Sequence, residues 1–172
     1  MDVHSKEQRH KNMSAIRAAN TKPEMLVRKF LFSKGYRYRL NYSALPGKPD
    51  IVLRKYRTCI FVNGCFWHGH EGCKYYVVPK TNTDFWTDKI GSNIRRDREV
   101  RRKLTQMGWY CITIWGCQLK SDKRAQTLMS LDYMLNHIFL TIHSVIRPTN
   151  QENAVQFKQD YNKSNKTDTH DA

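Results

Sequence analysis

The segment NGCFWHGHEGC, residues 63–73, carries the densest group of metal-ligating side chains in the sequence. Cys65, His70 and Cys73 are separated by four and two residues, which are spacings that can wrap a tetrahedral zinc ion. A closed site needs a fourth ligand, and Cys117 is the best candidate because neighbouring strands can bring strand ends together. The alternative is an exposed loop in which these residues coincide by chance. Three soft ligands within nine positions favour a structural zinc site, with no position left for water.

Other side chains in and near this segment have different expected roles. His68 is not needed as a ligand, and a loop held by zinc would place its imidazole for proton transfer at neutral pH. Cys59 and Cys111 alternate into expected strands, so we expect them to be buried like small apolar side chains. Phe66 and Trp67 leave two interpretations open. They cap the zinc as core residues, or they are exposed wedges that insert between base pairs.

A second chemical feature is the aspartate in LPGKPDIVL, residues 45–53. Pro49 favours extended backbone at Lys48, so we expect Asp50 at a rigid strand mouth, directly before the apolar run Ile51–Leu53. Magnesium prefers hard oxygen ligands, few of them from the protein, and one aspartate at the edge of a basic surface suits it. The alternative is an ordinary turn aspartate, which this motif taken alone favours.

Two helices are expected to flank these segments. The first begins at Thr21, a suitable N-cap followed by Pro23, and ends at Gly35. Its buried stripe would consist of Met25, Leu26, Phe30 and Leu31. The second spans about residues 83–107 and has one apolar and one basic side. The apolar side is Trp86, Ile90, Ile94, Val100 and Leu104, and the basic side is Arg95, Arg96, Arg98, Arg101, Arg102 and Lys103.

β-Branched and aromatic residues predict strands within residues 36–45, 48–64 and 109–116, with a hairpin turn at residues 54–57. A last amphipathic helix would bury Leu128, Leu131, Met134, Leu135 and Ile138. We therefore expect an α/β protein, an α+β mixed sheet flanked by helices, within one domain at residues 21–147. Residues 1–20 would form a basic arm or first helix, and the polar residues 148–172 a disordered tail.

The charge of the chain indicates a polyanionic partner. The net charge is +15, from 30 Lys and Arg against 15 Asp and Glu. The last 25 residues carry three lysines against four acids, so the preceding 147 carry +16. Nucleic acid is the favoured partner, and an acidic membrane, another protein or a purely solubilising surface are the alternatives. The start of the sequence is polar and no stretch is apolar enough to span a membrane, so we expect a cytoplasmic protein whose cysteines are free or bind metal.

The chain resembles the very-short-patch-repair family of DNA mismatch endonucleases. The resemblance runs from about Val3 to Leu119, and five stretches carry it: DVHSKEQRHKNMSAI, LPGKPD, NGCFWHGHEGC, FWTDKIGSNIRRDR and GWYCITIWGCQL. It implies a fold similar to type II restriction endonucleases, with a mixed sheet flanked by helices. It also implies a DNA repair enzyme that nicks duplex DNA 5′ to the thymine of a T·G mismatch, left by deamination of 5-methylcytosine.

The resemblance further implies roles for individual residues. Asp50 and the main-chain carbonyl of Val62 would bind catalytic magnesium, His68 would act as general base or orient the attacking water, and Glu24 would support the site through a water. The zinc ligands would be Cys65, His70, Cys73 and Cys117. The DNA-binding residues would be the intercalating Phe66, Trp67 and Trp86, then Met13 from the opposite groove, and Lys89 and Asn93 beside the mismatched pair.

The sequence departs from related nucleases at the second strand, where Phe61-Val62-Asn63 replaces a carboxylate–x–lysine triplet, so His68 must do the work of the lysine. Asn63 stands where many members have histidine, and Gly72 is an extra residue between the zinc ligands. We expect a monomer that acts on double-stranded DNA, with a functional link to a cytosine-5 DNA methyltransferase and to mismatch-repair proteins. The rival hypotheses are a restriction-like endonuclease that cuts matched DNA and a non-catalytic, zinc-dependent DNA-binding module.

Overall fold

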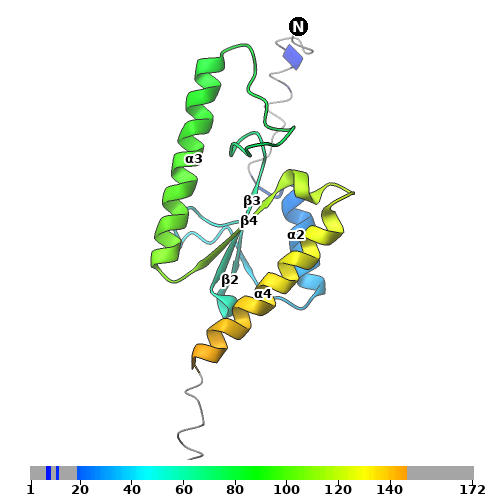
Figure 1. The fold of residues 1–172 in the computed structure, drawn as a ribbon, viewed down its shortest axis with the longest axis vertical. Coiled ribbons are helices and arrows are strands. Elements are labelled where there is room, and N and C mark those ends of the chain that lie inside the picture. The colour runs from blue at the N-terminus through cyan, green and yellow to red at the C-terminus, as the bar shows by residue number, and fades with distance from the viewer. Residues whose placement is uncertain (1–6, 9–10, 12–18, 147–172) are drawn as a thin grey trace, which may run out of the picture. The chain divides into compact units, whose positions relative to one another are not determined.

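The computed structural model describes residues 7–8, 11 and 19–146 (Figure 1). The chain divides into two compact units, Met1–Leu135 and Asn136–Ala172, and the first contains the whole sheet. The expectations for Met13, for most of the arm at residues 1–20 and for the tail at residues 148–172 fall outside the described residues. In chain order the elements are α2 (Lys22–Ser33), β1 (Arg39–Leu40), β2 (Ile51–Leu53), η1 (Arg54–Tyr56), β3 (Thr58–Asn63), α3 (Thr83–Gln106), β4 (Tyr110–Trp115), η2 (Gly116–Leu119) and α4 (Arg124–Ile146).

The sheet has four strands in the order β1-β2-β3-β4. The first three are antiparallel, whereas β3 and β4 run parallel and are joined through the long helix α3. The α+β mixed sheet flanked by helices is therefore confirmed, as is the hairpin turn at residues 54–57. The first strand is much shorter than expected, because Asn41 adopts a positive φ of 44° and turns the chain after Leu40.

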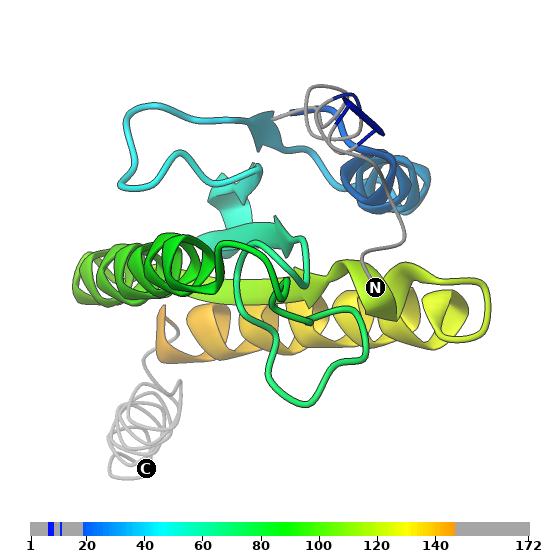
Figure 2. The same ribbon diagram turned by 90° about the horizontal axis from the view of Figure 1, so that it is seen from above.

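Helices cover both faces of the sheet. Val27 and Leu31 of α2 pack with Leu131 of α4 against Ile51 and Ile60 on one face, and Leu104 of α3 packs on Val52 and Cys59 on the other. Seen from above, α2 and α3 lie on opposite sides of the strands (Figure 2). Since side chains alternate along a strand, each of β2 and β3 serves both layers. Cys59 is buried as expected, and Cys111 is half-buried against the same cluster.

Two of the expected apolar stripes are confirmed in part. In α2, Leu31 is buried and Leu26 and Phe30 are half-buried, but Met25 is 38% exposed, and the buried face also includes Glu24, Val27 and Arg28. The hydrophobic count omits Glu24 and Arg28 because they are buried as a bonded pair and not as solvent-facing charges. In α4, Met134 is 40% exposed. Of the other residues expected there, Leu128, Leu131 and Leu135 are buried, and Ile138 is half-buried.

The loop before β2 also differs from its expected form. Lys48 has a φ of +47° and is not extended, although it precedes a proline. The reason is a tight turn: Gly47 also has a positive φ, of +73°, and the Lys48 amide donates to the Leu45 carbonyl at 3.2 Å. Within the described residues, no helix is long and apolar enough to cross a membrane.

Candidate active site and metal centre

A cleft of about 690 Å³ opens between the loop before β2, the end of β3 and helix α3. Its walls include six of the residues expected to act in catalysis or on DNA, together with acidic and basic side chains from three elements. The lining residues are Thr21, Pro23, Glu24, Gly47, Lys48, Asp50, Phe61, Val62, Asn63, Gly64, Trp67, His68, Asn93, Arg96, Asp97, Val100 and Arg101. Tertiary structure thus brings Glu24, Asp50, Val62 and His68 to one cavity.

Asp50 is held between two neighbouring strands. Its Oδ2 accepts a hydrogen bond from the Val62 amide at 2.8 Å, and its carbonyl accepts one from the Asn41 amide at 3.3 Å. Burial raises the pKa of Asp50 above its ordinary value; the Val62 amide opposes this and the Glu24 carboxylate adds to it. A buried carboxylate beside a second carboxylate is stabilised by a bound cation, so the electrostatics of this position suit a metal ligand.

The main chain of Val62 offers a second oxygen ligand at the same place. Its amide donates to the Asp50 side chain. This contact lies just beyond the Ile51–Ile60 pair, where the pairing of β2 with β3 ends. The N–H and C=O groups of one strand residue point to the same side, so the Val62 carbonyl lies on the edge that faces Asp50. One carboxylate and one carbonyl are hard oxygen donors, and this donor set fits magnesium with water and phosphate completing the shell.

Glu24 approaches the site from α2 and is 4% exposed. Its carboxylate accepts hydrogen bonds from the Thr21 hydroxyl at 2.9 Å, the Asn20 amide at 3.1 Å and Arg28 Nη2 at 2.7 Å. A carboxylate has about four lone-pair sites, so these bonds leave about one, on Oε1, for a water in the cleft. Thr21 caps the helix by accepting from the Glu24 amide, as expected from the sequence.

His68 has a carboxylate partner that the sequence reading missed. Its Nδ1 lies 2.5 Å from Oδ2 of Asp97 on α3. A carboxylate at Nδ1 leaves Nε2 as the proton-accepting nitrogen and stabilises the imidazolium that forms. The signal was present in the helical periodicity: Asp97 lies four residues after Asn93 and seven after the buried Ile90, on the side of α3 that faces the protein.

Gly69 allows the histidine loop to lie directly on α3. It has a φ of +60°, and a Cβ built at this position would lie 2.5 Å from Cδ1 of Ile94. A larger residue would require the Ile94 side chain to shift and would be strained at this φ. The glycine between His68 and His70 thus positions both rings.

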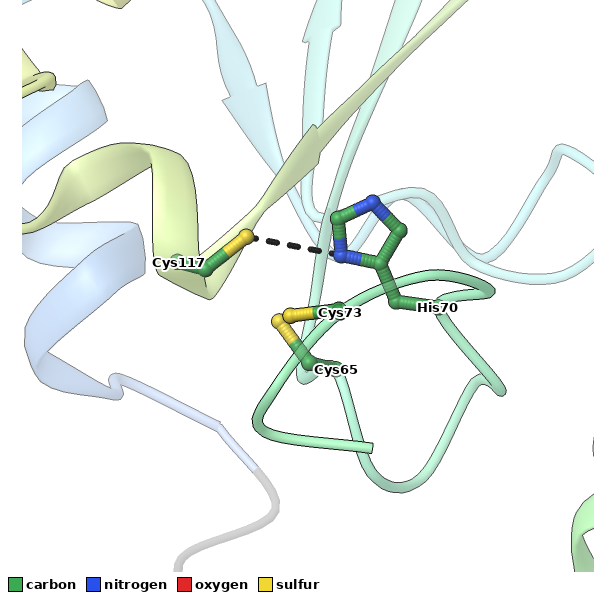
Figure 3. A group of neighbouring side chains, drawn as sticks. All are labelled: Cys65, His70, Cys73 and Cys117. Carbon is green, nitrogen blue, oxygen red and sulfur yellow. Dashed lines mark hydrogen bonds between the residues drawn. The ribbon is translucent and has the colours of Figure 1, made fainter. Parts of the chain in front are cut away.

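Cys65, His70, Cys73 and Cys117 form one cluster (Figure 3). Their ligand atoms all lie within 4.8 Å of one another. Three come from the loop after β3 and Cys117 from η2 after β4, as the parallel pairing of these strands requires. In a tetrahedral site with zinc–sulfur bonds of about 2.3 Å, sulfurs lie roughly 3.8 Å apart, so this group fits a metal ion with little movement. Gly72, the extra residue, has a φ of +68° and open space around it.

A ring contact supports the cluster, and its neighbouring thiols shift the pKa values of one another. The His70 ring stacks on Trp115 with centroids 4.1 Å apart, and its Nδ1 lies 3.4 Å from the Cys117 sulfur. Burial and the neighbouring Cys65 and Cys73 thiols raise the pKa of Cys117 to about 12. A backbone hydrogen bond at Tyr75 lowers the pKa of Cys73. Thiols so close together can all ionise only when a cation lies between them.

Comparisons with known proteins agree with this geometry. A profile of the family described as "DNA mismatch endonuclease Vsr" matches residues 1–74. The type II nicking enzyme V.NmeAIP of Neisseria meningitidis is 48% identical over 120 residues, 70% of this chain and 85% of that protein. The DNA mismatch endonuclease Vsr of Escherichia coli K12 is 42% identical over 123 residues, 72% of this chain and 78% of that protein. This chain belongs to the Vsr family. It is therefore a DNA endonuclease.

The aromatic residues of this Vsr-family chain gather beside the cleft. Phe66 and Trp67 from the loop lie 5.3 and 5.8 Å from the Trp86 ring of α3, between centroids. All three are half-buried. Phe85, which the sequence reading did not single out, is 60% exposed and contacts Trp86 edge to face at 5.1 Å.

The two residues expected beside the mismatched pair are placed differently. Asn93 lines the cleft but is 8% exposed; its Nδ2 donates to the Trp67 carbonyl at 2.9 Å, and its Oδ1 accepts from Arg96 at 3.1 Å. Lys89 is exposed on α3 and is not part of the cleft wall. Asn93 therefore holds the loop of Trp67 against α3 in this structure.

Proposed function

We propose that this endonuclease is magnesium-dependent and nicks one strand of duplex DNA 5′ to the thymine of a T·G mismatch. The observation that carries the proposal is the shared cleft of Asp50 and His68, with Asp97 behind the histidine. Vsr-family membership supports it, since one relative is named a mismatch endonuclease and others are named nicking enzymes. The product is a strand break at a deaminated 5-methylcytosine, which is the first step of very-short-patch repair.

The proposed chemistry divides between metal ligands and a proton acceptor. Magnesium held by Asp50 and the Val62 carbonyl would supply charge stabilisation for the phosphate in the transition state. Nε2 of His68 would accept a proton from water while the water oxygen bonds to phosphorus. One P–O bond of the backbone breaks, and the leaving oxygen keeps the electron pair and takes a proton from solvent. Asp97 orients the imidazole and stabilises its charged form. Glu24 positions a water through its remaining lone pair.

Zinc is the proposed occupant of the cysteine–histidine cluster, with a structural role. All four coordination positions would be filled by protein, which leaves none for a reacting water. The ion would fix the loop that carries His68, Phe66 and Trp67. Structure and reaction are thereby linked, because the same loop holds the proton acceptor and the aromatic residues.

Mismatch selectivity is proposed to come from the cost of opening the stack. Phe66, Trp67 and Trp86, with Met13, would insert between base pairs, which costs a few kcal/mol per step. A mispaired step opens more easily than a paired one. Lys89 would contact the mismatched pair directly. Asn93 would contact the pair after releasing the Trp67 carbonyl, or would keep Trp67 in place beside the pair. A cytoplasmic monomer with a functional link to a cytosine-5 methyltransferase and mismatch-repair proteins completes the proposal.

The test is a nicking assay on two duplexes of equal sequence, one with a T·G mismatch and one with a matched pair. We expect a single nick in the thymine strand of the mismatched duplex with magnesium, and none with chelator. Equal cutting of both duplexes would refute mismatch specificity, and linearisation of an unmodified plasmid would favour the restriction-like alternative. Tight binding without cleavage under every condition would favour the DNA-binding module.

A further inference from the structure

Two of the cations that line the cleft have no ion-pair or hydrogen-bond partner among the residues that the structure describes. Arg96 donates to Asn93 Oδ1, and among the acids Glu24 is bonded to Arg28 and Asp97 to His68. Lys48 and Arg101 also line the cleft and are exposed, but neither has an ion-pair or hydrogen-bond partner among the described residues. These two unpaired cations lie on the wall of a cavity that also holds three carboxylates. Their position suits the binding of an anion.

The backbone that presents Lys48 is constrained. Gly47 and Lys48 both have positive φ values, +73° and +47°, in the turn closed by the Leu45 carbonyl. Positive φ is unfavourable for a lysine, and backbone of this type persists when its surroundings enforce it, often at functional sites. Pro49 follows directly and Asp50 next, so the turn sets Lys48 two residues from the proposed metal ligand.

The same turn is pressed against α3 beside Arg101. A Cβ built on Gly47 would lie 2.8 Å from Cγ2 of Val100, and closer still to Cγ1. Only glycine therefore lets the loop approach Val100, which precedes Arg101 in the helix. The contact fixes the loop of Lys48 next to the helix turn of Arg101 and sets the two cations on adjoining walls of one cleft.

We propose that Lys48 and Arg101 together bind the phosphodiester group of the DNA strand that enters the cleft, at the linkage to be cut. Arg101 offers a planar fork of donors for two phosphate oxygens and Lys48 a point charge. Their two positive charges offset the repulsion between the phosphate and the carboxylates of Glu24, Asp50 and Asp97. The identity of the linkage rests on the proposed function, whereas the phosphate site itself does not.

The test compares binding to natural duplexes and to duplexes that carry one uncharged methylphosphonate linkage, moved one position at a time across the nick. Binding is measured in calcium without cleavage, for the wild type, Lys48→Gln and Arg101→Gln. Each variant is expected to bind natural duplex roughly tenfold more weakly, and the dependence of log K on log salt is expected to fall by about one. At one linkage, the methylphosphonate should abolish the difference between variant and wild type.

Arg98→Gln is the matched control, because Arg98 is exposed on α3 one turn before Arg101 but does not line the cleft. Its effect should be the same on every duplex. Gly47→Ala keeps all charges and should reproduce the loss seen with Lys48→Gln, with thermal unfolding measured to show that the variant is folded. A loss for Lys48→Gln and Arg101→Gln that is identical at every linkage would overturn the phosphate site. If one linkage abolishes the difference between variant and wild type but the protein does not nick DNA, the phosphate site stands and only the proposed function is refuted.

Discussion

The cleft and the cysteine–histidine cluster share one loop but use its two histidines in opposite ways. His70 faces a thiol, Cys117, inside a group of four ligand atoms that close on one point. His68 faces a carboxylate, Asp97, at the wall of an open cavity of about 690 Å³. A closed ligand set contributes to folding and leaves no room for substrate, whereas a sparse set leaves positions for water and phosphate.

The comparison also shows how a small domain can keep a reactive site rigid. Gly69 separates the two histidines, and its contact with Ile94 holds the loop on α3. Order in the cluster is therefore transmitted over two residues to His68. Loss of a cluster ligand should therefore disrupt both regions, whereas loss of a cleft residue should remove only activity.

The largest effect is expected for Cys117→Ser. Apparent binding free energies of structural zinc are about 10–16 kcal/mol in small domains, so loss of one ligand should leave the protein without metal and largely unfolded at 25 °C. Zinc content by elemental analysis and unfolding by circular dichroism measure this. Cys59→Ser is the matched control, since Cys59 lies outside the cluster, and it should keep its metal. Stoichiometric metal and normal stability in Cys117→Ser would show that Cys117 is not a ligand.

Asp50→Ala should remove activity and leave the cluster intact. Loss of the charged oxygen ligand is expected to lower the single-turnover nicking rate by about 10³-fold or more, with zinc content and fold unchanged. Full nicking activity in this variant would refute the role of Asp50 in the cleft. A loss of zinc would show that the cluster depends on the cleft, contrary to the expected independence of the cluster.

His68→Ala should lower the nicking rate by roughly 10²–10⁴-fold, the usual contribution of a general base. Asp97→Asn is expected to have a smaller effect, because it removes only the carboxylate that orients and stabilises the imidazole. Single-turnover nicking rates of the two variants, with thermal unfolding measured to show that both are folded, check this order. An unchanged rate in Asp97→Asn would assign Asp97 a structural role only.

The smallest effect is a gain in stability. Since burial raises the pKa of Asp50, its ionised form destabilises the folded state at neutral pH. This cost shrinks as the pH falls below the raised pKa and is absent below the ordinary value of 3.8. Asp50→Asn should therefore unfold at a temperature a few degrees higher than the wild type in chelator at pH 7, and the difference should vanish at acidic pH. With magnesium present the wild type should regain part of the difference. A lower unfolding temperature for Asp50→Asn in chelator at pH 7 would contradict the proposed electrostatics.

Local patterns predicted much of this protein before any contact was known. The N-cap at Thr21, the hairpin turn at residues 54–57 and the extent of α3 follow from neighbouring residues, and all three are confirmed. The ligand group Cys65, His70 and Cys73 is local too, and Cys117 joined it through the parallel pairing of β3 and β4. These features can be predicted from the sequence because the groups that interact are close along the chain or are aligned by strand pairing.

Only the tertiary structure decided the features that depend on distant groups. The α2 stripe omitted Glu24 and Arg28, which form an ion pair in the interior, because a hydrophobicity count treats each as exposed. Asp97 was missed because its partner His68 is 29 residues away, across a crossover. Lys48 departed from its local preference because the turn at Gly47 is packed against Val100 of a helix that lies far ahead in the chain. The sequence alone thus determined which residue types and which chemistry are present. Packing determined which residues pair, since tertiary contacts can stabilise a buried charge or a backbone conformation that the adjacent residues in the sequence disfavour.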